Sequence, residues 1–279
     1  MPNNTAVLIT KANGEREPFY AEKLFQSLVR SGADKDLAHQ ITGRIASSIH
    51  DGDRTQDIYT RAFSELRRIE RPMAARYSVK RALLALGPSG YPFEDFMAEI
   101  YRLLGYLAET RIVVAGKCVE HELDFVAVRN EERLAAEAKY HNNAGLKSDL
   151  KVALYVQARF EDIAARHDTD GEAYTTRMLV TNTKFTQQAE LYAACVGLSL
   201  ISWNYPSEGN LRELIEQTRV HPLSCLTSLS RAHKRQLMER GLVLCRHIQE
   251  HPAELETLGL SNRVIDKVLG ETEHLCGGA

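Results

Sequence analysis

Apolar and polar residues alternate along residues 120–141, which read EHELDFVAVRNEERLAAEAKYH. A period of two predicts two strands joined by a charged turn, the second of them over residues 134–140. This second strand is apolar except at Glu137 and Lys139. Because residues i and i+2 of a strand share a face, these two side chains point the same way. Asp124 lies on the first strand, from which it can come close to both.

Further elements on either side of this pair predict an α/β sheet. A helical apolar spacing predicts helices over residues 93–107, 148–165 and 186–196, and Gly197 is a typical stop for the last of them. Apolar runs predict strands over residues 112–115, 178–181 and 198–203. A strand, a helix and a second strand in succession predict a parallel pair joined by a right-handed crossover.

The remaining chain is predicted to be mostly helical. Residues 5–19 read as a hairpin turning at Asn13-Gly14. Helices follow over residues 20–31 and 35–49, then one with Thr55 as its N-cap, then one between Pro72 and Gly87-Pro88. The fold class is therefore α/β multidomain. The predicted domains are a helical unit with a hairpin (5–92), an α/β sheet domain (93–206) and a helical C-terminal region (207–279).

In this last region, helices are expected near residues 211–219, 230–240, 242–250 and 262–274. Their spacing resembles helix-hairpin-helix modules, in which amides at a helix N-terminus grip a backbone phosphate. A helical bundle that closes the fold or makes an oligomer contact explains the same pattern.

Composition and charge narrow the setting. The chain has 279 residues, of which 44% are hydrophobic and 26% charged, as in ordinary globular proteins. It has no apolar run long enough to span a membrane and no evident signal peptide. Its five cysteines are scattered and form no C-x-x-C pair, which predicts a reduced, cytoplasmic protein. The net charge of −2 gives no global attraction to nucleic acid, so DNA contacts would have to come from local patches.

The charged residues of the strand pair suggest chemistry. Two carboxylates, Asp124 and Glu137, can hold Mg²⁺ through oxygen ligands. The ion can activate water and neutralise charge on a phosphate, and Lys139 beside it can stabilise developing charge. An ordinary solvated salt bridge is the alternative. Burial favours the first interpretation, because unpaired charges in an apolar strand are costly.

With its flanking elements, this arrangement resembles the PD-(D/E)xK nuclease superfamily, and within it the Mrr-like domain of type IV restriction endonucleases. The matching segments, between about residues 108 and 206, are HELDFVA, AEAKYH and LVTNTKFTQQA. The resemblance implies that Asp124 and Glu137 bind the metal and that Lys139 assists the nucleophile. Gln157 matches a glutamine often found near such sites, although an exposed polar residue of a helix would look the same. Leu123 stands where the motif has proline.

The N-terminal region resembles the ATP-cone, a regulatory nucleotide-binding domain. Positions 5–92 match in order at Val7, Lys11, Gly14, Glu17-Pro18-Phe19, Lys23-Leu24, Thr55, Ile58-Tyr59, Arg76-Tyr77 and Lys80-Arg81. The resemblance implies that Lys11, Lys23, Lys80 and Arg81 contact phosphates of ATP or dATP. Thr55 and the hairpin that begins at Val7 would lie near the base or ribose. Ala12 stands where the family has arginine, so one phosphate-binding cation is missing.

These features together predict an Mg²⁺-dependent endonuclease that acts on double-stranded DNA. ATP or dATP would regulate it, and it would be a homo-oligomer. The alternative is a nucleotide-sensing DNA-binding regulator without cleavage activity. A nuclease that acts on RNA or branched DNA is a third interpretation.

Overall fold

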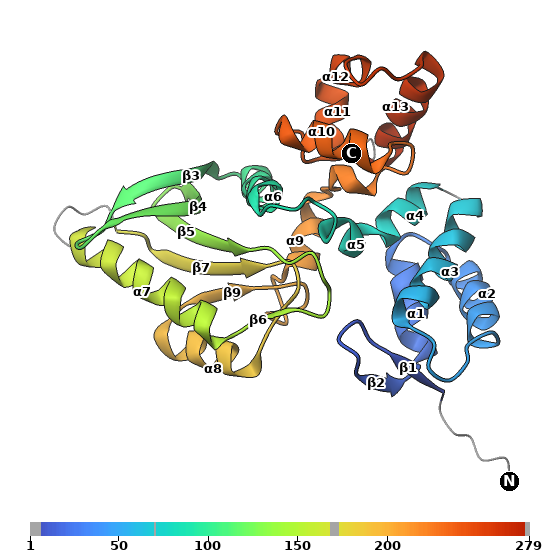
Figure 1. The fold of residues 1–279 in the computed structure, drawn as a ribbon, viewed down its shortest axis with the longest axis horizontal. Coiled ribbons are helices and arrows are strands. Elements are labelled where there is room, and N and C mark those ends of the chain that lie inside the picture. The colour runs from blue at the N-terminus through green and yellow to red at the C-terminus, as the bar shows by residue number, and fades with distance from the viewer. Residues whose placement is uncertain (1–6, 70, 168–172, 277–279) are drawn as a thin grey trace, which may run out of the picture.

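The computed structural model describes residues 7–69, 71–167 and 173–276. The ends of the predicted domains at residues 5–6 and 277–279 lie outside the described residues. Within them the chain is a multidomain α/β fold in which a helical N-terminal part, a central sheet and a helical C-terminal part follow one another (Figure 1). The predicted fold class is confirmed.

The N-terminal part is a hairpin followed by short helices. Its elements are β1 (Leu8–Thr10), β2 (Arg16–Pro18), α1 (Ala21–Arg30), α2 (Lys35–Ala46), α3 (Thr55–Ile69), α4 (Arg71–Tyr77) and α5 (Val79–Leu83). The hairpin is antiparallel and turns at Gly14, whose φ of 85° suits glycine. Apolar residues between Ile9 and Ala74 form a cluster of their own, here called the N-terminal core.

Two details of the predicted helices were wrong. The helix expected between Pro72 and Gly87 is two helices, α4 and α5, and the second ends at Leu83. Thr55 was expected to cap α3, but it is the first residue of that helix, and its hydroxyl donates to the carbonyl oxygen of Thr10 at 3.2 Å. This bond joins α3 to the end of β1.

The central part is a five-stranded mixed sheet of order β3-β4-β5-β7-β9. Its strands are β3 (Leu107–Ala115), β4 (Glu120–Arg129), β5 (Glu132–Lys139), β7 (Thr176–Thr181) and β9 (Ser199–Ile201). The first three strands pair antiparallel, and β5, β7 and β9 pair in parallel. A small parallel pair, β6 (Lys147–Ser148) with β8 (Lys184–Phe185), lies beyond the carboxyl ends of β5 and β7. The strand pair and the parallel crossover were therefore predicted correctly.

Helices cover both faces of this sheet (Figure 1). On one face α6 (Tyr91–Leu103) packs against β3 and β4. On the other lie α7 (Leu150–His167) and α8 (Gln187–Val196), which share a core with Leu123, Ala135 and Leu179. Thr186 caps α8 by accepting from the amide of Ala189. None of the described helices combines the length and apolarity that a membrane span requires.

The C-terminal part packs on the same core as α6. Its elements are α9 (Leu211–Thr218), a 3-10 turn (Leu223–Cys225), α10 (Arg231–Glu239), α11 (Cys245–Glu250), α12 (Ala253–Glu256) and α13 (Asn262–Cys276). One buried cluster, here called the joint core, runs from Ala75 through α6 and the sheet to Leu275. It therefore crosses both predicted domain boundaries. All five cysteines are free thiols.

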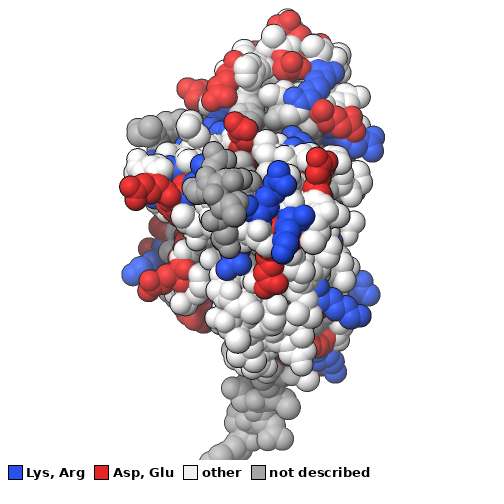
Figure 2. Space-filling view, turned by 90° about the vertical axis from the view of Figure 1, so that its left-hand side faces the viewer, with Lys and Arg blue, Asp and Glu red and all other residues white. Residues whose placement is uncertain are grey.

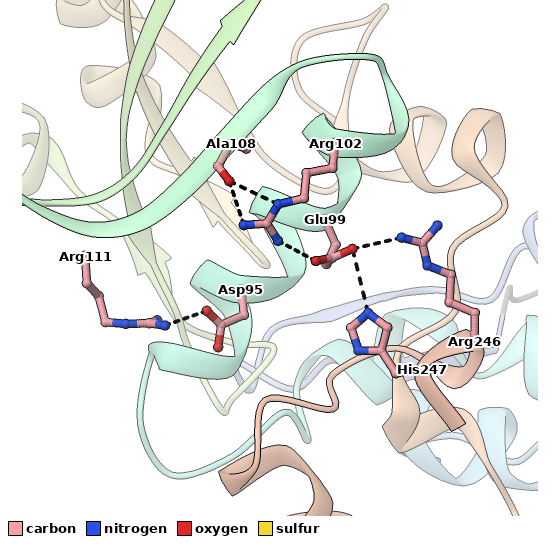
Figure 3. Close-up of polar contacts among 7 residues, drawn as sticks. All are labelled: Asp95, Glu99, Arg102, Ala108, Arg111, Arg246 and His247. Atoms are coloured by element: carbon pink, nitrogen blue, oxygen red, sulfur yellow. Dashed lines mark hydrogen bonds and ion pairs between the residues drawn. The ribbon is translucent and has the colours of Figure 1, made fainter. Parts of the chain in front are cut away.

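A polar cluster also ties α6 to α11 (Figure 3). The carboxylate of Glu99 pairs with Arg102 on its own helix and, at 2.9 Å, with Arg246 of α11. His247 lies 3.7 Å from the same carboxylate. Hydrogen bonds from His247 and then from Arg102 lower the pKa of Glu99 to about 2. Glu99 is therefore held as an anion at the contact between the two parts.

We expect Glu99→Gln to lower the free energy of unfolding by about 2 kcal/mol, because it leaves the partly buried Arg246 and the more exposed Arg102 without their carboxylate. The depressed pKa stabilises the folded state above the unfolded value of 4.5. The difference from wild type should therefore shrink as the pH falls from 4.5 toward about 2. Urea unfolding measures both effects. As control, Glu254→Gln removes the more exposed pair with Arg240 and should cost less than about 1 kcal/mol.

Candidate active site and an adjoining cation-lined cavity

Asp124 and Glu137 meet across the antiparallel strands β4 and β5. The register pairs Phe125 with Ala136, and its extension by one residue places Asp124 opposite Glu137. Side chains opposite each other in this way have Cβ atoms about 5 Å apart. The Oδ2 atom of Asp124 accepts a hydrogen bond from the amide of Ala138 at 2.6 Å. The aspartate carboxylate therefore lies at the peptide that follows Glu137.

An irregularity in the sheet makes this contact feasible. The pairing of β3 with β4 is interrupted between Thr110–Phe125 and Ile112–Leu123, and Arg111 in the gap has a φ of 56°. Leu123 packs with α7 and α8, whereas Phe125 packs in the joint core with α6. The regular alternation of β4 is thus broken at Asp124. Its side chain is free to reach the backbone of β5.

Burial makes both carboxylates poor anions in the absence of a cation. Burial and then the nearby Asp124 raise the pKa of Glu137 to about 7. Burial also raises the pKa of Asp124, which the Ala138 hydrogen bond and Arg159 partly offset. Two close carboxylates that are both partly desolvated attract a cation and, failing one, protons. Strongly shifted carboxylates of this kind mark candidate functional sites.

Arg159 of α7 supplies part of the missing positive charge, and the sequence analysis did not identify it. Its Nη1 atom pairs with Oε2 of Glu137 and donates to the carbonyl oxygen of Glu122 at 3.0 Å. Its other Nη atom donates to the hydroxyl of Tyr155. Only 14% of the Arg159 side chain is exposed, so the pair with Glu137 is largely shielded from water. In the sequence, the only feature that could have identified Arg159 is its position next to the apolar stripe of α7.

Glu94 is a third acidic residue that the sequence analysis missed. It lies in the first turn of α6 and is buried, with 6% of its surface exposed. Burial and then Asp124 raise its pKa to about 7. The Oε2 atom of Glu94 lies 3.4 Å from Nη1 of Arg111, the residue with positive φ in β3. Glu94 therefore approaches the strand pair from the α6 side of the sheet.

Lys139 ends β5, two residues beyond Glu137, and its side chain is exposed. Beyond it the chain is held firmly: Asn182 accepts from the backbone amide of His141 at 2.8 Å and donates to its carbonyl oxygen at 2.7 Å. Nε2 of His141 lies 3.1 Å from the hydroxyl of Ser148. Burial, and then Lys139, lower the pKa of His141. The carboxyl end of β5 thus carries an exposed ammonium group, and the backbone that follows it is held by hydrogen bonds.

Gln157 is buried, so the alternative that it is an exposed polar residue of a helix is wrong. Its exposed fraction is 4%, and its Nε2 atom donates to Glu161 at 2.9 Å. Its Oε1 atom is buried and has no hydrogen-bond partner among the described residues. A buried acceptor without a donor destabilises the fold. The Oε1 atom of Gln157 can therefore gain a hydrogen bond from a further donor.

The donor set fits a magnesium ion held mainly by water. In the described parts of the chain, no group of three or more His, Cys, Asp or Glu side chains is arranged to hold a metal. Mg²⁺ keeps several waters and is commonly bound through one or two carboxylates, which Asp124 and Glu137 offer. Burial raises the pKa of both residues, and a cation bound between them would offset the cost of their charges.

The residues predicted to bind nucleotide do not all come together. Lys11 and Lys23 both approach Glu17, at 2.7 Å and 3.8 Å from its Oε2 atom. Lys23 and Lys80 also line a cavity of about 910 Å³. Arg81 stacks over the ring of Tyr59, which lines the same cavity. The lining does not include Val7, Lys11 and Thr55, and the Thr55–Thr10 bond places Thr55 beside the hairpin.

Three parts of the chain build this cavity. One wall comes from α1, α3, α4 and α5, a second from the turn after β9 together with α9, and a third from the end of α13. The space lies where the N-terminal helices, the sheet and the C-terminal helices converge (Figure 1). Its volume is in the range of sites that hold ligands of nucleotide size.

Charge is mixed elsewhere on the surface. The described part of the face in Figure 2 shows lysine and arginine interspersed with aspartate and glutamate, without a broad area of one sign. A long-range electrostatic pull on nucleic acid is therefore not a property of this end of the sheet.

A pair of partly buried carboxylates on a mixed sheet and a separate cation-lined cavity are the main candidate sites of this multidomain α/β protein. Comparison with known proteins identifies its family. Residues 221–276 match the family model described as AF1548-like, C-terminal. An uncharacterised protein of Archaeoglobus fulgidus is 34% identical over 182 residues, which are 65% of this chain and the whole of that protein. The chain therefore belongs to the AF1548-like family.

Solved structures agree with this assignment. The crystal structure of the protein of unknown function AF1548 has a TM-score of 0.57 and 32% sequence identity, and the match covers 68% of this chain and 100% of that one. Can2 from Sulfobacillus thermosulfidooxidans, solved with cyclic tetra-adenylate, matches 74% of this chain and 64% of its own. Its TM-score is 0.30 at 14% identity, which is too low to support an inference about fold or function.

Proposed function

We propose that this AF1548-like protein is an Mg²⁺-dependent DNA endonuclease and that ATP or dATP regulates it through the N-terminal part. One observation carries the proposal. Two partly buried carboxylates, Asp124 and Glu137, face each other across β4 and β5, and Lys139 follows on the same face. Burial disfavours the charge on both carboxylates, although Arg159 already pairs with Glu137.

The residues divide the chemistry among themselves. When bound, Mg²⁺ would supply charge neutralisation for the phosphate and an acidified water. Asp124 and Glu137 would hold it, and the Ala138 hydrogen bond fixes the orientation of the aspartate. Lys139 is exposed, so its ammonium group can orient the attacking water and stabilise the charge that develops on the five-coordinate phosphorus centre. Arg159 would have to release Glu137 or share it with a bound metal, because its Nη1 atom already pairs with one of the two carboxylate oxygens.

Contact between the hairpin and the active-site loop supports the regulatory half of the proposal. Gly145 lies in the loop that follows β5, and a Cβ atom there would come within 3.0 Å of the carbonyl oxygen of Ala12. The turn of the hairpin therefore packs directly on this loop. The loop begins directly after Lys139, and Gly145 is six residues from it, so a movement of the hairpin can reach the active site through this loop.

The test is cleavage of supercoiled plasmid, methylated and unmethylated, with and without Mg²⁺, ATP and dATP. Lys139→Ala should lower the cleavage rate by about 10²–10³-fold, because it removes one charge stabiliser, and the exposed position of the side chain should let the variant fold. Lys151→Ala, an exposed lysine at the start of α7, is the matched control and should cleave like wild type. Full activity of folded Lys139→Ala would refute the mechanism.

A nucleotide-sensing DNA-binding regulator without cleavage activity is the second candidate. The pair of Arg159 with Glu137 favours it, because an arginine that permanently neutralises this carboxylate would exclude the metal. The same plasmid assay separates the two. Nucleotide-dependent retention of DNA, with no cutting under any metal condition, would establish the regulator.

A further inference from the structure

Cations crowd the walls of the cavity between the three parts of the chain. Among its described lining residues, lysine and arginine occur at 23, 30, 76, 80, 212 and 219, whereas the carboxylates are Glu22 and Glu216. These cations come from helices far apart in sequence, so the fold itself brings them together. Such crowding is unfavourable unless an anion shares the space.

Two of these cations, Arg30 and Lys80, and the histidine of the lining, His221, have lowered pKa values. Burial and then the nearby Arg212 lower the pKa of Arg30, which lies across the cavity on α1. Burial and then Lys184 lower the pKa of Lys80 to about 8. For His221, burial and the more distant charge of Arg76 lower the pKa to about 4. No carboxylate of the described residues lies within ion-pair distance of Lys80, so its charge is unmatched.

Aromatic rings lie between these cations. Tyr59 and Tyr77 stack with ring centroids 5.1 Å apart, and both line the cavity. On the opposite wall the ring of Trp203 lies 5.3 Å from Nζ of Lys80. Rings that face a water-filled space beside cations provide stacking surfaces for a base next to a grip for its phosphates. A simple anion would need the charges but not the rings.

We propose that this cavity binds a nucleoside polyphosphate, with its phosphates among Arg30, Lys80 and Arg212 and its base stacked against Trp203. The proposal rests on the nucleotide half of the proposed function and adds to it. The turn after β9 and α9 form one wall of the site, so the ligand would join the N-terminal helices to the rest of the molecule. Lys11 of the hairpin and Thr55 at the start of α3 are not among the residues that line the cavity.

Trp203 also links the cavity to the candidate active site. Its backbone amide donates to the carbonyl oxygen of Thr183 at 3.3 Å. Thr183 follows Asn182, which holds the backbone of His141 at the end of β5. A ligand stacked on Trp203 therefore rests on a chain of contacts that ends two residues from Lys139.

Calorimetric titration of the full chain with ATP and dATP, in buffer without divalent metal, tests the site. We expect Arg212→Gln and Trp203→Leu each to weaken binding about tenfold or more, with circular dichroism unchanged. Trp203→Phe should restore most of the affinity, because it keeps a stacking surface. Arg235→Gln, an exposed arginine on α10, is the matched control and should bind within about twofold of wild type.

Two results would overturn the inference. One is wild-type affinity in both Arg212→Gln and Trp203→Leu together with weakened binding in Lys11→Ala, which would place the nucleotide on the hairpin alone. The other is the absence of binding by wild type. Plasmid cleavage without nucleotide is measured separately, so loss of the cavity proposal leaves the nuclease proposal intact, and failure to cleave leaves the binding result intact.

Discussion

Asp124→Asn is expected to abolish metal-dependent cleavage, with a loss of about 10³-fold or more, while the protein stays folded or becomes slightly more stable. The amide keeps an oxygen that can accept from Ala138, so the local geometry survives. It removes one of two close carboxylates whose charges burial disfavours. The site therefore loses a metal ligand and, at the same time, a source of repulsion.

Thermal unfolding without metal tests the second half of this expectation. A gain of about 1 kcal/mol corresponds to a rise in Tm of roughly 2–4 °C for a chain of this size. Glu122→Gln is the matched control, because Glu122 is an exposed carboxylate on the same strand and should leave both Tm and cleavage unchanged. A fall in the Tm of Asp124→Asn by several degrees would show instead that this carboxylate is a structural partner and not a site for a cation.

Glu137 is expected to make stability depend on both pH and magnesium. Its folded pKa of about 7 lies above the unfolded value of 4.5, so the folded state binds more protons between these values. Without metal, the free energy of unfolding should therefore fall as the pH rises from 4.5 through about 7. Glu94 has the same sign of shift and adds to the slope. Glu137→Gln should remove about half of it.

Magnesium should reverse this trend. The ion binds the ionised carboxylates, so added Mg²⁺ should raise Tm little near pH 5 and most above about pH 7. In Glu137→Gln the metal effect should be lost at every pH, and a Glu254→Gln control should behave like wild type. Thermal unfolding with Mg²⁺ and with a chelator, across this pH range, gives the result. An Mg²⁺ effect that is equal at low and high pH would point to binding elsewhere.

Local patterning was enough to predict the strands that carry the site. Alternation identified β4 and β5, and the i, i+2 rule placed Glu137 and Lys139 on one face, since both signals depend only on neighbours in sequence. The edge strand β3 was predicted only from residue 112, whereas it begins at Leu107. Its first half exposes alternate residues to solvent and includes polar Glu109 and Thr110, so it lacks the apolar run that was used to find strands.

Residues that reach the site from other elements could not be predicted. Arg159 pairs with Glu137 across 22 positions, and Glu94 approaches from α6 on the opposite face of the sheet. Either residue would read as an ordinary helix-surface charge in the sequence. The burial of Gln157 likewise depends on how α7 packs, which periodicity alone does not determine. Which charges become buried is a tertiary property, and it decides what the site can do.

The joint core has a consequence for how the chain folds. The N-terminal core is built from residues 9–74, which are near one another in sequence and close only short loops. The joint core instead joins segments far apart in sequence, and polar contacts beside it show the distances: Glu99 pairs with Arg246 across 147 positions, and Ser224 donates to Ala82 across 142. To form such distant contacts, the chain must lose loop-closure entropy before the contacts themselves stabilise it. The N-terminal helices can therefore form early. During synthesis the apolar faces of α5 and α6 stay exposed until residues 221–276, which match the AF1548-like family model, have emerged to cover them.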